Sequence, residues 1–145
     1  MVLTFKRLRD HAKIPSRATE SSAGMDLSAA LTDPVEIPPH EIRLIPTGIA
    51  AAPDCKDVML MLCARSGLAA KHGIGLANGV GIVDADYRGE ICVALINQSD
   101  VPFTVTDGLR IAQMIAVPVI LPKIVESDIL PETDRGSGGF GSTGF

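Results

Sequence analysis

The chain is poor in aromatic residues: among its 145 residues there is no Trp, one Tyr and four Phe. Aliphatic side chains must therefore form the core, and an apolar fraction of 46% is sufficient for one domain of this length. No apolar stretch approaches the roughly twenty residues that a membrane-spanning helix needs. The N-terminus also lacks the charged and then apolar pattern of an export signal. We expect no membrane association.

Cysteine and net positive charge are scarce as well. Cys55, Cys63 and Cys92 are widely spaced and form no CxxC or Cys/His pattern, so we expect neither a disulfide framework nor a structural zinc site. This favours a reducing cytoplasm. The net charge of -4 excludes the general basic excess of a nucleic-acid-binding protein. An anionic small ligand would need positive groups that are placed locally.

Short apolar runs alternate with clusters of Pro, Gly, Asp and Asn, which is typical of an all-β chain. The predicted strands cover residues 35–37, 42–45, 58–63, 91–96, 103–105 and 111–117. Two of these runs, 58–63 and 91–96, are almost continuously apolar and predict buried strands. Ten prolines leave room for one short helix, capped by Ser66 and ended by Gly73 in the left-handed conformation. A sandwich or jelly roll is expected.

The last eleven residues differ from the rest, because five of them are glycines. We predict one domain over residues 1–134 and a mobile tail over residues 135–145. One interpretation is a disordered terminus. The other is a closing segment, because an Arg, a Phe and a Ser-Thr pair are spaced among the glycines like contact points. The tail lacks the Lys and the following helix of a P-loop.

Two short segments suggest an anion site. Asp26 stands among small and apolar residues, either as a turn former or as a buried, paired carboxylate. Arg65, Ser66 and Gly67 combine a forked cation, a helix start with unpaired N–H groups, and a residue that lets a ligand approach the backbone. The alternative is an ordinary helix cap beside a surface Arg.

Residues 78–90 are the most informative segment. We interpret them as part of a hairpin with arms near 78–83 and 88–96, whose backbone, with Asn78, can read the edge of a flat base. Uracil presents an acceptor, a donor and an acceptor there, and cytosine reverses two of these. Asp84 follows the apolar arm, where partial desolvation would make it a base for water, or it is a turn residue. Tyr87 is either a core residue or a flat plate against a sugar.

A polar residue interrupts the apolar strand at 111–117. Gln113 needs hydrogen-bond partners, which a ligand or ordered water can supply. Arg110 is either a phosphate contact or, as we favour, a member of a structural ion pair.

Five segments, in this order along the chain, resemble the five motifs of the trimeric dUTP pyrophosphatase family. They are Ala-Gly-Met-Asp-Leu at 23–27, Arg-Ser-Gly-Leu-Ala at 65–69, Gly-Ile-Val-Asp-Ala-Asp-Tyr-Arg-Gly-Glu at 81–90, Arg-Ile-Ala-Gln at 110–113 and Arg-Gly-Ser-Gly-Gly-Phe-Gly-Ser-Thr-Gly at 135–144. The resemblance implies a distorted jelly-roll β-barrel and a homotrimer with active sites shared between chains. It implies hydrolysis of dUTP to dUMP and pyrophosphate by attack of water on the α-phosphorus, which keeps uracil out of DNA and supplies dUMP.

The resemblance also implies a role for each site residue. Asp84 would activate the water, and Tyr87 would press on the deoxyribose and exclude a 2′-hydroxyl. Asn78 and the backbone of Ile82, Val83 and Cys92 would bind uracil. Phosphate contacts would come from Arg65, Ser66, Gly67 and Gln113, and from Arg135, Gly141, Ser142 and Thr143 of the tail, with Phe140 stacked on the base. Mg²⁺ is the expected cofactor, and Asp26 would reach it through water.

Two other functions remain as alternatives. A dCTP deaminase of related fold needs a catalytic Glu where this chain has Ala94, which argues against deamination. A nucleotide sensor with a protein partner is the alternative from another class. One departure from the family pattern is Ala64 before Arg65, where Pro is frequent. The loop at Lys56 and Asp57 receives no role.

Overall fold

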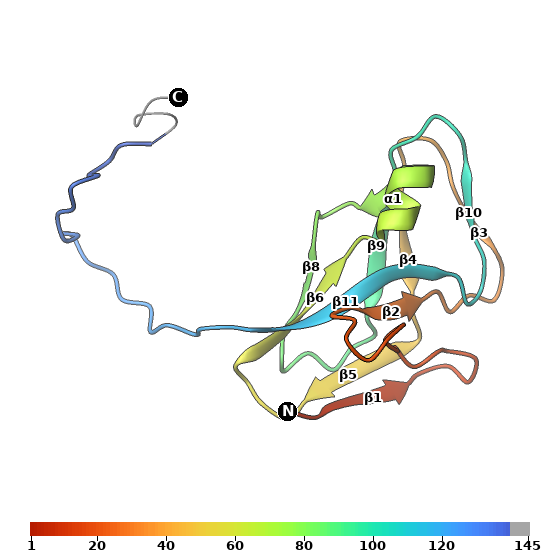
Figure 1. Cartoon of the computed structure of the whole chain (residues 1–145), viewed down its shortest axis with the longest axis horizontal. Helices are drawn as coiled ribbons and strands as arrows, with labels where there is room; N and C mark the ends of the chain where they lie inside the picture. The colour runs from red at the N-terminus through yellow and green to blue at the C-terminus, as the bar shows by residue number, and fades with distance from the viewer. Residues whose placement is uncertain (140–145) are drawn as a thin grey trace.

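The computed structural model describes residues 1–139, and its elements are eleven strands and one short helix (Figure 1). The predicted all-β class is confirmed. The strands are β1 (Leu3–Arg7), β2 (Met25–Ser28), β3 (Val35–Ile37), β4 (Ile42–Pro46), β5 (Ile49–Pro53), β6 (Val58–Cys63), β7 (Ile74–Leu76), β8 (Gly81–Val83), β9 (Cys92–Asn97), β10 (Phe103–Val105) and β11 (Arg110–Pro118). The helix α1 spans Ser66–His72.

The strands form four small antiparallel sheets, and within residues 1–139 these do not close into a barrel. The largest sheet has the order β2-β11-β6-β8, and a second has the order β4-β9-β7. Two strand pairs, β1-β5 and β10-β3, complete the body. Most neighbours in the sheets are far apart in the sequence, as in Greek-key connections.

The core lies between these sheets and is aliphatic, as the composition requires. Its largest fully buried side chains include Leu27, Ile37, Ile45, Leu60 and Met114. Burial of such side chains contributes roughly 1.5–3 kcal/mol each.

β6 and β9 are buried on one face only, which differs from the prediction for their apolar runs. Along both strands fully buried residues alternate with partly exposed ones. On the outer face of the largest sheet, Met61 of β6 pairs with Ile115 of β11 and with Ile82 of β8. An apolar strip on this face is therefore left partly open in a single chain.

The helix ends as predicted but begins differently. Gly73 closes α1 in the left-handed conformation (φ 65°), and its N–H donates to Ala69 O. The predicted cap by Ser66 is wrong, because Arg65 takes the cap position and no side chain caps the helix. Ser66 is an exposed residue and is already the first residue of the helix.

After β11 the chain leaves the body as an extended segment, residues 119–134, which we call the arm (Figure 1). Within residues 1–139, its last backbone hydrogen bond to the body joins Val119 N–H to Asp57 O (2.9 Å). No helix among residues 1–139 is long and apolar enough to cross a membrane.

Candidate active site

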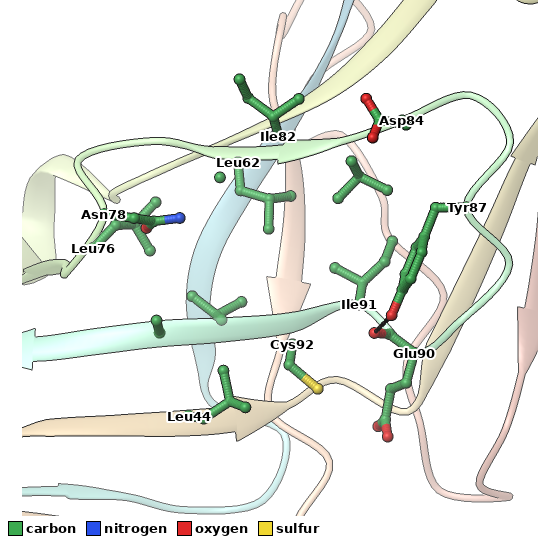
Figure 2. A pocket seen from close by; sticks show the side chains of 14 residues that line it. Leu44, Leu62, Leu76, Asn78, Ile82, Asp84, Tyr87, Glu90, Ile91 and Cys92 are labelled. Atoms are coloured by element: carbon green, nitrogen blue, oxygen red, sulfur yellow. Dashed lines mark hydrogen bonds between the residues drawn. The ribbon is translucent and has the colours of Figure 1, made fainter.

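A pocket of about 420 Å³ opens between β8 and β9, and we call it the β8–β9 pocket (Figure 2). It brings together six of the residues that the sequence predicted for base, sugar and water. These are Asn78, Ile82, Val83, Asp84, Tyr87 and Cys92. Its apolar walls include Leu44, Leu62, Leu76 and Ile91.

The predicted hairpin is wrong in its pairing. β8 pairs with β6, whereas β9 pairs with β4 and β7, so the two strands belong to different sheets. Each strand pairs with partners from elsewhere in the chain, and the segment between them is a loop that joins two sheets. β8 and β9 therefore face each other across the pocket instead of bonding to one another.

This arrangement leaves backbone groups free to bind a ligand. β7 pairs with residues 95–97 of β9, and Ala77 N–H extends that contact to Ala94 O (2.8 Å). Because backbone groups alternate in direction along a strand, the N–H and C=O of Cys92 point to the same side as those of Ala94. No described strand pairs with Cys92 on that side. The edge of β8 away from β6 is likewise without a strand partner among the described residues. Such edges can read the donors and acceptors of a flat base.

Asp84 stands at the mouth of the pocket, one residue after β8, and its side chain is exposed. The predicted partial desolvation of its carboxylate is therefore absent from the single chain, because the turn after β8 lies on the surface. The turn is held by Tyr87 N–H, which donates to Asp84 O (3.1 Å).

Tyr87 is not a core residue: it is 46% exposed and lines the pocket. Its hydroxyl donates a hydrogen bond to the backbone carbonyl of Glu90 (3.0 Å). Figure 2 shows the ring extending from the turn toward Glu90, beside Ile91.

Two charged groups affect the thiol in the pocket. Burial raises the pKa of Cys92 above its ordinary value, and the negative charge of Glu90 raises that pKa further. Arg9 opposes this shift. The thiol is therefore kept protonated at neutral pH, which makes Cys92 a poor nucleophile.

A second pocket, of about 390 Å³, lies between β2, the start of α1 and β11. We call it the arginine pocket. It collects the residues predicted for phosphates and metal: Asp26, Arg65, Ser66, Gly67 and Gln113. Arg110 lines it as well.

Asp26 joins the two arginines of this pocket. Its Oδ1 lies 3.0 Å from Arg65 Nε, and its Oδ2 lies 2.9 Å from Arg110 Nη1. The structural ion pair favoured for Arg110 is thus present, and Asp26 is a paired carboxylate. One negative and two positive charges leave the cluster with a net positive charge, which suits an anion.

Gln113 has one partner within the chain. Its Nε2 donates to Ala64 O (3.0 Å), so the chain itself satisfies part of this amide. A β-carbon on Gly24 would collide with the amide oxygen, so glycine is needed opposite the side chain. The pair Gly24 and Gln113 escapes a reading of the sequence, because β2 and β11 pair across a long interval.

The two pockets share no lining residue. Of the predicted tail contacts, Arg135 is exposed and its Nε donates to Gly138 O (2.9 Å), so it joins neither pocket. Phe140, Gly141, Ser142 and Thr143 lie outside the described residues.

The side chains of the arginine pocket are better suited to a metal ion that arrives bound to substrate phosphates than to an ion held permanently by the protein. Residues 1–139 contain no cluster of three or more His, Cys, Asp or Glu side chains that would hold one. Both oxygens of Asp26 already accept from arginines. A carboxylate has about four acceptor sites, so Asp26 can still accept a hydrogen bond from a metal-bound water. Mg²⁺ usually keeps several waters when it binds with substrate phosphates.

Sequence reasoning missed the groups that hold the loop after Asp84. Glu90 Oε1 accepts from Gly48 N–H (2.7 Å), and its Oε2 lies 3.5 Å from Arg9 Nη2. The only signal in the sequence was a charged residue directly before an apolar run.

Comparisons with known proteins agree with one another. The family model described as dUTPase matches residues 10–144. The chain is 53% identical over 142 residues to the deoxyuridine 5'-triphosphate nucleotidohydrolase of Desulfitobacterium hafniense, covering 98% of this chain and 94% of that protein. It is 55% identical over 142 residues to the protein of the same name from Rickettsia felis, covering 97% and 95%. The solved structure of the Staphylococcus bacteriophage 80alpha dUTPase with dUpNHpp is similar over 99% of each chain, with a TM-score of 0.86 and 25% identity.

Proposed function

The chain belongs to the dUTPase family and hydrolyses dUTP to dUMP and pyrophosphate, and we propose that Asp84 activates the attacking water at a site shared between chains. The observation that carries this proposal is the gathering of Asn78, Asp84, Tyr87 and the unpaired backbone of Cys92 around one pocket. We infer that these groups would serve one nucleotide as base reader, sugar plate and catalytic carboxylate.

Base selection would come from the two strand edges that border the β8–β9 pocket. The backbone of Ile82, Val83 and Cys92, with the amide of Asn78, would match the acceptor, donor and acceptor of uracil. Cytosine would leave donors and acceptors of a partly buried site unpaired, which costs about 1–3 kcal/mol for each group. Ala94 lines the same pocket, where a dCTP deaminase would need a catalytic Glu, and its methyl side chain cannot act as an acid or base. The carboxylate of Glu90 is engaged with Gly48 and Arg9, which argues against deamination.

Asp84 would place the water opposite the leaving pyrophosphate and accept its proton. The water oxygen bonds to the α-phosphorus as the bond to the bridging oxygen of the β-phosphate breaks. General-base catalysis of this kind contributes about a hundred- to ten-thousand-fold to the rate. Because Asp84 is exposed in one chain, we infer that substrate and other parts of the assembly cover it during the reaction.

The arginine pocket would hold the phosphates. Arg65, Ser66 and Gln113 offer donors there, and the ion pairs to Asp26 fix the arginine heads. A triphosphate brings roughly four negative charges, more than the arginines balance, and Mg²⁺ supplies the remaining charge neutralisation when bound. Asp26 would contact it through water.

We propose that the site is completed in a homotrimer. The two pockets share no lining residue, so a base half from one chain and a phosphate half from another would make one site. The apolar strip on the outer face of β6, β8 and β11 needs cover. The arm carries six exposed large apolar residues that also need a partner surface: Ile120, Leu121, Ile124, Val125, Ile129 and Leu130.

The tail, residues 135–145, would then close over a site formed by other chains. The direction of the arm supports this proposal, because it carries the chain away from its own body (Figure 1). Residues 1–134 would form the folded domain that carries the tail. We place the enzyme in the cytoplasm, where three free cysteines are stable. Nucleic acid and membrane are not proposed as partners.

Offering dUTP, dCTP, dTTP and UTP with Mg²⁺, and measuring pyrophosphate and ammonia separately, tests the assignment. We expect pyrophosphate from dUTP alone and no ammonia. A hydrogen-bonding site rejects a mismatched analogue by about ten-thousand-fold or more. Comparable turnover of dCTP or UTP would contradict the roles given to the strand edges and to Tyr87, and release of ammonia would indicate deamination.

A further inference from the structure

The ring of Tyr87 is held from two sides although it belongs to an exposed turn. Its hydroxyl donates to the carbonyl of Glu90 (3.0 Å). A β-carbon on Gly89 would collide with the hydroxyl and with two ring carbons. The ring therefore occupies the space that a side chain at position 89 would need, and only glycine leaves that space free.

The acceptor of this hydrogen bond is itself anchored. The Glu90 carboxylate accepts from Gly48 N–H (2.7 Å) and lies near Arg9 (3.5 Å). Arg9 in turn donates to Ala30 O (2.6 Å). The side chain of Glu90 thus ties its own backbone to two other segments of the body.

The next residue adds a second anchor. Ile91 N–H donates to Ile49 O (2.8 Å), and its carbonyl accepts from the hydroxyl of Thr47. These three residues are almost fully buried. The Tyr87 hydroxyl therefore bonds to a carbonyl directly before a buried and hydrogen-bonded core residue, while its α-carbon sits on a surface turn.

A wall that excludes a single hydroxyl has to stay in place. An exposed tyrosine on a turn ordinarily samples several rotamers. A ring that swings away leaves space for a 2′-hydroxyl, so discrimination falls even if the tyrosine is present. The contacts that hold the Tyr87 ring in place therefore determine how well the site rejects a sugar with a 2′-hydroxyl.

We propose that Gly89 and Glu90 are positioning residues that hold the Tyr87 ring as the sugar-facing wall, so that rejection of ribonucleotides depends on them as well as on Tyr87. This inference rests on the proposed function, because it assumes that a sugar lies against Tyr87. Neither Gly89 nor Glu90 is among the residues proposed above to bind the nucleotide.

The composition allows a direct measurement of the ring. The chain has one Tyr and no Trp, so its intrinsic fluorescence reports on Tyr87 alone. We expect high fluorescence anisotropy in the wild type and a clear fall in Gly89→Ala. Gly75→Ala is the matched control, because a β-carbon there meets no atom within 4 Å. This readout needs no substrate, so it fails or succeeds independently of the proposed function.

Kinetics supply the second readout. In Gly89→Ala the ratio of kcat/KM for dUTP to that for UTP should fall by about tenfold or more, mostly through KM, while Gly75→Ala keeps the wild-type ratio. Glu90→Ala should lower the ratio similarly, and Glu90→Gln should restore it, because the amide oxygen still accepts from Gly48 N–H.

Thermal unfolding shows which of these variants are folded. If Gly89→Ala or Glu90→Ala does not fold, Tyr87→Phe, a surface change that removes only the hydroxyl, should lower the ratio by itself. The proposal is overturned if the folded variants keep both wild-type anisotropy and the wild-type ratio. It is also overturned if Tyr87 is already freely mobile in the wild type.

Discussion

Asp84 stands where β8 ends and the chain turns away from the sheet. The turn is closed by Tyr87 N–H on the carbonyl of Asp84 (3.1 Å), which leaves the carboxylate directed to the mouth of the β8–β9 pocket. Asp86, two residues later, does not line this pocket. The two acids of the turn are therefore separated by geometry, which supports the proposal that Asp84, and not Asp86, acts on the nucleotide.

Replacing Asp84 by Asn should lower kcat by about a hundred- to ten-thousand-fold, because the amide keeps the shape and is a very poor base. Binding of dUTP, measured by calorimetry, should change little. Asp86→Asn is the control and should keep near wild-type activity. If the Asp84→Asn enzyme retains more than about a tenth of the wild-type rate, Asp84 is not the base and another acid must have this role.

Helix α1 shows how an element can depend on one residue. Gly73 ends it at φ 65°, and a β-carbon at this position would lie 3.1 Å from Ser99 N. The other end of α1 carries Arg65, Ser66 and Gly67 into the arginine pocket. A shift of the helix would therefore move the proposed phosphate contacts.

We expect Gly73→Ala to destabilise the protein by about 1–3 kcal/mol, because alanine is strained at positive φ and the space is filled. Gly75→Ala, two residues away in β7, should change the free energy of unfolding by less than about 1 kcal/mol, since its β-carbon meets nothing. Chemical denaturation of both variants measures the difference. Equal stabilities would show that the left-handed end of α1 is unimportant.

Elements set by local chemistry are the ones that the sequence predicts. The turn residues around Val35–Ile37 and Phe103–Val105 bound those strands, and Gly73 ends the helix, without reference to the rest of the chain. Pairing is different, because β8 and β9 are neighbours in sequence yet join separate sheets. Which strands pair is decided by packing across the whole body, so the hairpin prediction failed while its residues still met at one pocket.

The site residues follow the same division. Residue chemistry predicts that Arg110 pairs with an acid, but the position of Asp26 between two arginines appears only in the fold. The contact of Gly89 with Tyr87, and that of Gly24 with Gln113, likewise depend on backbone paths. The family resemblance predicts the role of each site residue, whereas the contacts and distances between these residues come only from the fold.

At the scale of the whole molecule, the described part of the single chain leaves much apolar surface open. The arm exposes nearly all of Ile120 (92%) and Ile124 (93%), and an apolar strip lies open on the outer face of β6 and β11. We propose that a second copy of the chain covers these surfaces, because closed symmetric assemblies cover such surfaces with one another. Arm and tail should then have separable roles.

Two truncations separate these roles. Removing residues 135–145 should leave a stable trimer whose activity has fallen by about a hundredfold. The reason is the loss of the closing segment that completes the site and excludes water from it. Removing residues 119–145 should in addition weaken the trimer, because the apolar arm is gone. Sedimentation and activity assays of both proteins give the answer. Full activity of the shorter truncation would contradict a closing role for the tail.

The central claim is that one active site takes its base half and its phosphate half from different chains. Co-refolding Asp84→Asn, which damages the β8–β9 pocket, with Arg65→Ala, which damages the arginine pocket, tests it most directly. If the halves come from different chains, a random mixture of the two inactive proteins should recover about a quarter of the wild-type sites, each with both halves intact. If mass measurement confirms mixed trimers and they remain as inactive as the parents, each site lies within one chain and the claim is wrong.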